Sequence, residues 1–272
     1  MPELPEVQTV VNYLNPIISG KTIKSISNPN GYKNVFDKKG PSYFNSILLN
    51  KTIKNVTRRG KYIIIKINSE YLLIHLRMTG KLQTDKPSLR NMKYISFEIT
   101  FNDNTNLYFH DVRKFGKIYH SNNLAWLEKK IGIEPLSKKF NSNWLYNNLK
   151  HSKRMIKPFL MDQKFIAGLG NIYVDEALWE SSIYPKTKTN RISKKKTERL
   201  TMAIKNILNK AISYQGTTII NFTYGQNKIG NFSDELQIFG QKDKPCPRCQ
   251  EKIQKIFVDQ RGTHFCKICQ KY

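Results

Sequence analysis

The sequence lacks any run of about 20 consecutive apolar residues, the length that a membrane-spanning helix needs. Its N-terminus also lacks a basic region followed by an apolar stretch, so we do not expect a secretory signal. Cysteine is scarce: there are four, all within the last 30 residues, which argues against a secreted disulfide scaffold. We therefore expect a soluble, cytoplasmic protein. No internal repeat is evident.

Acidic residues are few as well. The chain has 20 Asp and Glu against 46 Lys and Arg, a formal net charge of +26. This excess is larger than solubility requires and predicts a polyanionic partner. A length of 272 residues favours two compact domains, or two and a small module.

The apolar pattern changes along the chain. Val7, Val10, Val11 and Leu14 form one helical stripe, which we expect to end at Asn15-Pro16. Short β-branched and aromatic runs then follow as far as about Ser121 and predict an antiparallel sandwich or barrel. These runs are Thr52–Thr57, Lys61–Ile67, Tyr71–Met78, Lys93–Phe101, Asn106–Val112 and Gly116–His120.

After Leu124 the pattern becomes helical, with a plausible linker at 132–135. The expected helices are Phe140–Lys150, Arg154–Asp162, Asn171–Ser181 and Ser193–Tyr214. The segment Gln215–Asp234 has few periodic apolar positions and is expected to be a long functional loop. Gly168-Leu169-Gly170 precedes the helix at Asn171, where main-chain N–H groups could bind an anion. Two such glycines before a helix are more often explained by ordinary turn chemistry.

The C-terminal cysteines have the spacing of a zinc site. Two C-x2-C pairs are separated by sixteen residues and supply four thiolates, a complete tetrahedral set that leaves zinc no open position. They are Cys246, Cys249, Cys266 and Cys269. The zinc would be structural; the alternative is two disulfides or free thiols. Between the pairs, a predicted hairpin would present Arg261 to a phosphate or a groove.

The N-terminus suggests a nucleophile. If Met1 is removed, Pro2 becomes a secondary amine, and an α-amino group with a pKa near 8 is partly unprotonated at neutral pH. Glu3 would lie beside it as an acid or base. The alternative is that these residues only begin a helix, which suffices for Pro5 and Glu6.

Several spaced motifs together resemble bacterial formamidopyrimidine-DNA glycosylases over essentially the whole chain. The motifs are Met1–Val7, Arg59–Tyr62, His75–Gly80, Asp111–Gly116, Gly168–Tyr173 and the terminal cysteines. The resemblance implies an α+β protein with three parts. These are an N-terminal β-sandwich with an N-terminal helix (1–130), a helical domain with a helix-two-turns-helix (131–236) and a zinc-ribbon β-hairpin (237–272). Double-stranded DNA would run between the first two domains.

The resemblance also implies roles for individual residues. Pro2 would be the nucleophile, Glu3 the acid that assists sugar-ring opening, and Lys61 a catalytic lysine that holds phosphate at the lesion. His75, Asn171 and Arg261 would be further phosphate contacts, although a lone histidine in an apolar strand is often only a core residue. Lys157 would bind DNA near the damaged base, and Glu6 and Glu176 would lie near the lesion.

An enzyme that attacks a sugar C1′ must extrude the nucleotide, which costs a few kcal/mol of stacking and pairing. Met78 and Phe115 could fill the gap as apolar wedges, while the Arg113 guanidinium could pair with the orphaned base. The resemblance implies the same roles. From sequence alone, Met and Phe are more often core residues.

The predicted function is a monomeric, bacterial DNA glycosylase with AP lyase activity in base excision repair. It would excise 8-oxoguanine and formamidopyrimidines through a Schiff base with Pro2 and cut by β,δ-elimination. One alternative is an endonuclease VIII-like enzyme for oxidised pyrimidines, against which Leu4 and the Met78–Arg113–Phe115 set argue. The other is a non-catalytic zinc-ribbon DNA-binding protein, which would leave Pro2, Glu3 and Lys61 unexplained.

Overall fold

A computed structural model describes residues 1–37, 39–218, 224 and 228–271. The chain divides into two compact units. The N-terminal unit contains residues 1–128 and 215–231, and the C-terminal unit contains residues 129–214 and 232–272. Among the described residues, no helix has the length and apolar character needed to cross a membrane.

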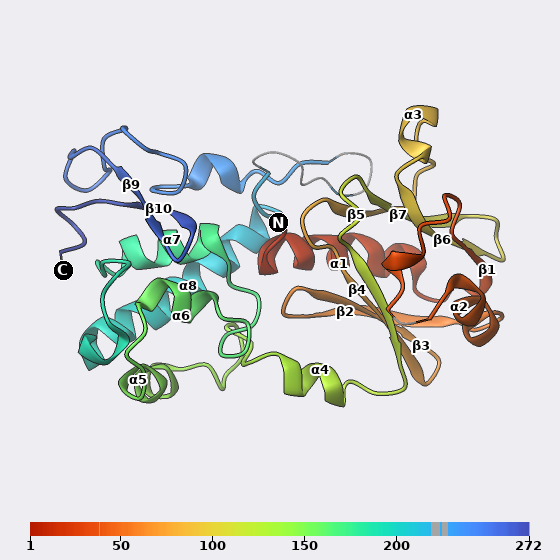
Figure 1. The fold of residues 1–272 in the computed structure, drawn as a ribbon, viewed down its shortest axis with the longest axis horizontal. Coiled ribbons are helices and arrows are strands. Elements are labelled where there is room, and N and C mark those ends of the chain that lie inside the picture. The colour runs from red at the N-terminus through yellow and green to blue at the C-terminus, as the bar shows by residue number, and fades with distance from the viewer. Residues whose placement is uncertain (38, 219–223, 225–227, 272) are drawn as a thin grey trace. The chain divides into compact units, whose positions relative to one another are not determined.

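The N-terminal unit is built on two antiparallel four-stranded sheets, ordered β1-β6-β7-β5 and β2-β3-β4-β8 (Figure 1). The strands are β1 Ile23–Ser27, β2 Ile53–Arg59, β3 Tyr62–Ile67, β4 Glu70–His75, β5 Gly80–Gln83, β6 Ile95–Phe101, β7 Asn106–Asp111 and β8 Lys117–Ser121. Helix α1 (Leu4–Ile18) packs on β2. One apolar core takes side chains from α1 and from both sheets, so the predicted α+β class with antiparallel sheets is confirmed.

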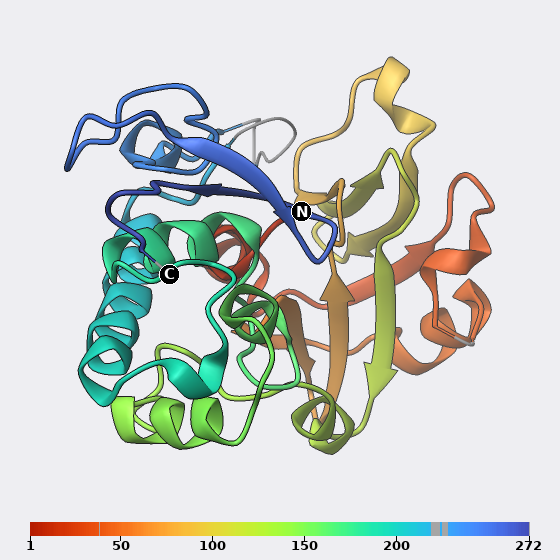
Figure 2. The same cartoon turned by 60° about the vertical axis from the view of Figure 1, so that its left-hand side comes forward.

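Three shorter helices of this unit were not predicted. They are α2 (Pro41–Leu48), α3 (Leu89–Met92) and α4 (Ala125–Lys130). Pro41 occupies the first helical turn of α2, where its missing N–H costs nothing, and Phe44 and Leu48 are buried one turn apart. In both views α3 lies at the end of an arm that projects from the sheet (Figures 1 and 2).

The prediction that α1 ends at Asn15-Pro16 is wrong, because the helix continues to Ile18. Proline removes one N–H from the last turn, which costs a helical hydrogen bond. Leu14 and Ile18, one turn apart on the same face, are both fully buried. Their burial in the core offsets the lost bond.

The C-terminal unit packs helices against a zinc ribbon. Helix α8 (Lys194–Ser213) contacts α5 (Ser142–Lys150) and α7 (Asn171–Glu180), and α7 also contacts α6 (Ile156–Met161). The predicted helices are thus confirmed within two residues at each end. Strands β9 (Gln254–Val258) and β10 (Arg261–Phe265) form the hairpin, and β10 lies against α7 (Figure 2). Short 3-10 helices occupy Lys33–Val35, Thr189–Arg191 and Phe232–Glu235.

Candidate functional site

The start of α1 holds the predicted nucleophile and acid. Glu3 is the N-cap residue of α1 and forms a reciprocal capping box with Glu6. The Glu3 main-chain N–H donates to Glu6 Oε2 over 2.7 Å, and the Thr217 N–H donates to Glu6 Oε1 over 2.8 Å. Pro2, Glu3 and Glu6 are all buried. Glu6 therefore fixes the Pro2–Glu3 peptide and ties it to a segment some 211 residues further along the chain.

Gly216, next to Thr217, must be a glycine. Its φ is +81°, in the left-handed region that side chains rarely adopt, and a Cβ there would lie 2.9 Å from Glu6 Oε1. The close approach of this turn to the start of α1 depends on the absence of a side chain.

Lys61 and His75 lie at the same end of one sheet. Strands β2 and β3 are joined by Gly60 and Lys61, with φ of +57° at Gly60, and Tyr62 pairs with His75. The Arg77 N–H donates to His75 Nδ1 over 3.1 Å. Nδ1 is therefore the acceptor, and the proton of the neutral ring resides on Nε2. His75 can thus serve as a neutral hydrogen-bond donor.

Two loops bring Met78, Arg113 and Phe115 together. Arg113 Nη1 lies 3.2 Å from Met78 Sδ, and Arg113 Cζ lies 5.0 Å from the centre of the Phe115 ring. Met78 is 43% exposed and Phe115 50% exposed. The alternative that these apolar side chains belong to the core is therefore excluded.

Asp111 holds both loops in place. This carboxylate is 1% exposed and accepts hydrogen bonds from Thr79 Oγ1 and from the Gly116 N–H. Thr79 Oγ1 in turn accepts from the Arg113 N–H over 3.1 Å. The Phe109 ring packs so closely below both loops that a Cβ on Gly116 would lie 2.3 Å from it. The packing of the loop backbones on the Phe109 ring thus helps to fix the conformation of the two loops, in addition to the contacts between their exposed side chains.

Lys157, Asn171 and Arg261 are brought together in the C-terminal unit. Lys157 Nζ lies 2.6 Å from Asp175 Oδ1, and both side chains are fully buried. Lys157 Nζ and Asn171 Nδ2 both donate to the Gly262 carbonyl, over 3.2 and 3.0 Å. Arg261, the preceding residue, is exposed at the start of β10. The hairpin turn itself is Asp259-Gln260, both with positive φ.

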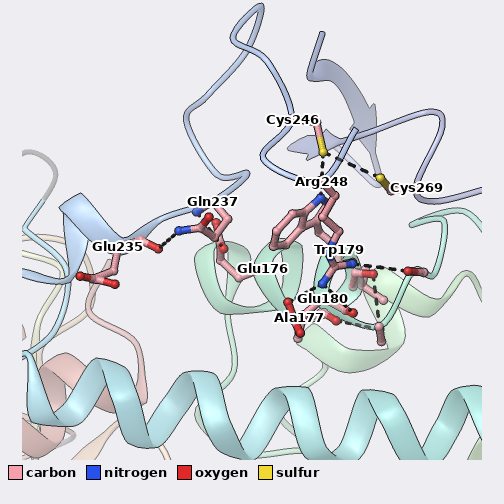
Figure 3. Close-up of polar contacts among 12 residues, drawn as sticks. Glu176, Ala177, Trp179, Glu180, Glu235, Gln237, Cys246, Arg248 and Cys269 are labelled. Carbon is pink, nitrogen blue, oxygen red and sulfur yellow. Dashed lines mark hydrogen bonds and ion pairs between the residues drawn. The ribbon is translucent and has the colours of Figure 1, made fainter. Parts of the chain in front are cut away.

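Glu176 has an extensive set of main-chain donors. Its carboxylate accepts the N–H groups of Gln237, Ile238 and Phe239 over 2.8–3.1 Å. Figure 3 shows Glu176 beside Gln237. Burial raises the pKa of Glu176, and the three N–H donors oppose that rise. These contacts anchor the segment that leads into the ribbon; proximity to the lesion stays a prediction.

The four cysteines are arranged for one zinc ion. Tetrahedral Zn–S bonds of about 2.3 Å place the sulfurs about 3.8 Å apart. The distance is 3.8 Å for Cys246–Cys269 and 3.3 Å for Cys249–Cys266, and all four sulfurs lie within 4.8 Å of one another. A disulfide needs about 2.0 Å, so the disulfide alternative is excluded. The set fits a structural zinc.

Helix α7 also contacts the zinc site. The Trp179 indole N–H points at Cys246 Sγ, 3.4 Å away, and the Arg248 guanidinium stacks 4.0 Å from the Trp179 ring (Figure 3). Burial opposes ionisation of the Cys246 thiol, but the neighbouring N–H donors outweigh it and lower its pKa to about 7. A thiolate ligand is favoured at this position.

Comparison with known proteins agrees with this arrangement. Three family models match: the formamidopyrimidine-DNA glycosylase N-terminal domain over residues 1–118, its H2TH domain over 131–223, and the zinc finger found in FPG and IleRS over 243–271. The formamidopyrimidine-DNA glycosylase of Bacillus subtilis is 38% identical over 278 residues, covering 99% of each chain. The chain belongs to the formamidopyrimidine-DNA glycosylase family.

Two solved structures of the Lactococcus lactis member of this family are similar to the chain. One is a variant in complex with Fapy-dG-containing DNA (TM-score 0.91), and the other is the wild type with DNA containing an oxidised pyrimidine (TM-score 0.90). Each is 38% identical and covers 100% of both chains.

The segment Gln215–Asp234, expected to be a long functional loop, is described only in part. Residues 219–223 and 225–227 lie outside the described residues, so the functional role of this loop stays a prediction. Tyr224 is described: it is buried in the apolar core of the N-terminal unit, and its ring lies 6.0 Å from that of Tyr13.

Asp111, Asp175 and Trp179 were not predicted as functional residues from the sequence. Asp111 was noted only as part of a motif. Asp175 follows Asn171 by one helical turn and stands beside Glu176 among the buried residues of α7, where a buried charge must have a partner. That polar interruption is the signal that could have identified it.

Proposed function

We propose that this family member is a bifunctional DNA glycosylase of base excision repair that excises oxidised purines and cleaves the DNA at the resulting site. The observation that supports it most directly is the buried start of α1, where Glu6 holds the Glu3 N–H over 2.7 Å. This contact fixes the Pro2–Glu3 peptide, so the Pro2 amine and the Glu3 carboxyl keep a constant relative orientation.

The chemistry begins at Pro2 after Met1 is removed. The amine attacks the sugar C1′, and the glycosidic bond breaks with its electron pair leaving on the damaged base. Glu3 donates a proton to the sugar-ring oxygen as the ring opens. The resulting iminium accepts electrons during β-elimination of one phosphate, and δ-elimination of the other follows.

Extrusion of the nucleotide uses the exposed loop residues. Met78 and Phe115 occupy the vacated space in the stack, and the Arg113 guanidinium donates to the orphaned base. Lys61 and His75 contact phosphate at the lesion. His75 does so as a neutral Nε2–H donor, since Nδ1 accepts the Arg77 N–H.

The C-terminal unit contributes phosphate contacts through Asn171 and Arg261. An amide nitrogen carries two protons, and the Gly262 carbonyl takes one proton of Asn171 Nδ2. The second proton serves the phosphate. Arg261 is exposed on a short β-ribbon, which suits the same task.

Borohydride trapping on a duplex with 8-oxoguanine tests the nucleophile. The protein should be cross-linked to the DNA, and Pro2→Ala or an uncleaved N-terminal extension should abolish the cross-link. Pro5→Ala is the matched control, because it changes a neighbouring proline of the same helix start and leaves the amine intact. Normal trapping and excision by Pro2→Ala would overturn the assignment.

A second candidate is excision of oxidised pyrimidines, because a similar structure holds DNA with such a base. Single-turnover rates decide between them. Faster excision of 8-oxoguanine than of thymine glycol, each opposite its usual partner, supports the purine assignment, and the reverse order supports the alternative. The monomeric state and cytoplasmic location stay predictions.

A further inference from the structure

A buried charge pair in the C-terminal unit takes no part in the proposed chemistry. Lys157 on α6 and Asp175 on α7 are 2.6 Å apart, with side-chain exposures of 1% and 0%. Lys157 therefore cannot serve as a surface cation for DNA in this arrangement. Replacing such a pair with apolar residues is often neutral or stabilising, so fold stability alone is a weak reason for the pair.

Both members of the pair hold the same strand. Lys157 donates to the Gly262 carbonyl over 3.2 Å, and Asp175 Oδ2 accepts the His264 N–H over 2.8 Å. The pair thus holds the β10 backbone through hydrogen bonds at two alternate residues, 262 and 264. Asn171 adds a second donor to the Gly262 carbonyl.

The Gly262 carbonyl that accepts these hydrogen bonds belongs to the residue directly after Arg261. Fixing the peptide that follows a residue fixes the direction in which its Cα–Cβ bond points. On the other side of Arg261, the two-residue turn with positive φ leaves little freedom. Arg261 and Lys157 also line one cavity between α6 and the hairpin. Ordering an exposed arginine on binding costs free energy, and this cost is smaller when its backbone is already held in place.

We propose that Asp175 is a positioning residue for Arg261. Through Lys157 and the His264 N–H, it sets the backbone of β10 so that the Arg261 guanidinium meets a DNA phosphate. The proposal rests on the phosphate contact of Arg261 in the proposed function. Asp175 itself does not touch DNA.

The test is a double-mutant cycle measured by DNA affinity at several salt concentrations. The zinc-loaded full chain is titrated with a duplex containing a tetrahydrofuran abasic analogue. Arg261→Ala should weaken binding by about tenfold and lower the slope of log K against log salt by about one unit. Asp175→Asn should reproduce most of both changes, and adding it to Arg261→Ala should change neither further.

Two further variants separate positioning from stability. Lys157→Met combined with Asp175→Asn removes both charges of the buried pair together with the Lys157 bond to the Gly262 carbonyl, so it should behave like Asp175→Asn. Glu180→Gln is the matched control: it breaks another contact between α7 and the ribbon, the exposed pair with Arg248. That change should leave the salt slope unaltered. Urea unfolding and zinc content confirm that each variant is folded.

The positioning role would be overturned if the losses of DNA affinity from Asp175→Asn and Arg261→Ala were additive. It would also be overturned if Arg261→Ala lowered the salt slope while both Asp175 variants left it unchanged. If Arg261→Ala itself has no effect, the phosphate contact in the proposed function fails, and the positioning role fails with it. Trapping at Pro2 is unaffected by that outcome, so the two failures are distinguishable.

Discussion

Removing the Asp111 carboxylate should release the two loops that carry Met78, Arg113 and Phe115. Asp111→Ala deletes the acceptor of both the Thr79 hydroxyl and the Gly116 N–H at a site that is 1% exposed. A buried donor left without an acceptor costs about 1–3 kcal/mol. The Thr79 hydroxyl can rotate to another acceptor but the Gly116 N–H cannot, so the free energy of unfolding should fall by about 1–3 kcal/mol.

The loss should also appear in base extrusion. The wedge side chains need a fixed loop pair to hold a stack open, and Asp111→Ala frees one loop from the other. The assays are urea unfolding for stability, and the fluorescence of 2-aminopurine beside the lesion for extrusion. Asp111→Asn keeps one acceptor oxygen and should lie between the wild type and the alanine variant in both measurements.

Asp103→Ala is the matched control, because Asp103 is also an aspartate of the N-terminal unit but its side chain is 50% exposed and pairs with Lys21 at the surface. An exposed pair contributes little to stability because solvent screens it, and extrusion should not change. If Asp111→Ala and Asp103→Ala have the same stability and the same extrusion signal, then Asp111 does not hold the loops.

Three further outcomes are expected. Arg113→Ala should slow excision opposite cytosine by about tenfold or more and reduce the ratio of the rates opposite cytosine and adenine. The reason is that cytosine O2 and N3 match the guanidinium donors, whereas adenine offers no such pair of acceptors. A rate ratio that is unchanged in single-turnover assays would refute this role. Cys266→Ser should lower the zinc content below one per chain and weaken DNA binding, whereas normal binding by a zinc-free preparation would contradict a structural metal. Burial, together with the charge of Lys81, lowers the pKa of His110, so the unfolded state binds a proton more readily. Stability should therefore fall as pH drops below the ordinary value of 6.5, and His110→Gln should flatten that slope in urea unfolding at pH 5 and 7; an identical slope would show that His110 is not its source.

The sequence by itself determined the features whose cause is local. A short run of β-branched and aromatic residues marks β3, which is buried on both faces, and the one-face stripe of Leu200, Ile204 and Leu208 marks α8. Each pattern reflects how a single element is buried. The zinc set is equally local, since two C-x2-C turns supply all four ligands. The order of motifs along the chain was enough to indicate the family.

Only the tertiary structure decided what the polar residues inside the units do. The family resemblance predicts that Lys157 lies near the damaged base, and the structure buries it against Asp175. Glu176 accepts three N–H groups from residues 61 to 63 positions further along the chain. Glu6 accepts a hydrogen bond from the Thr217 N–H, and Asp111 joins two loops that no pattern in the sequence connects. A buried charge or N–H must find a partner wherever the fold places one, and partners so distant in sequence leave no spacing pattern.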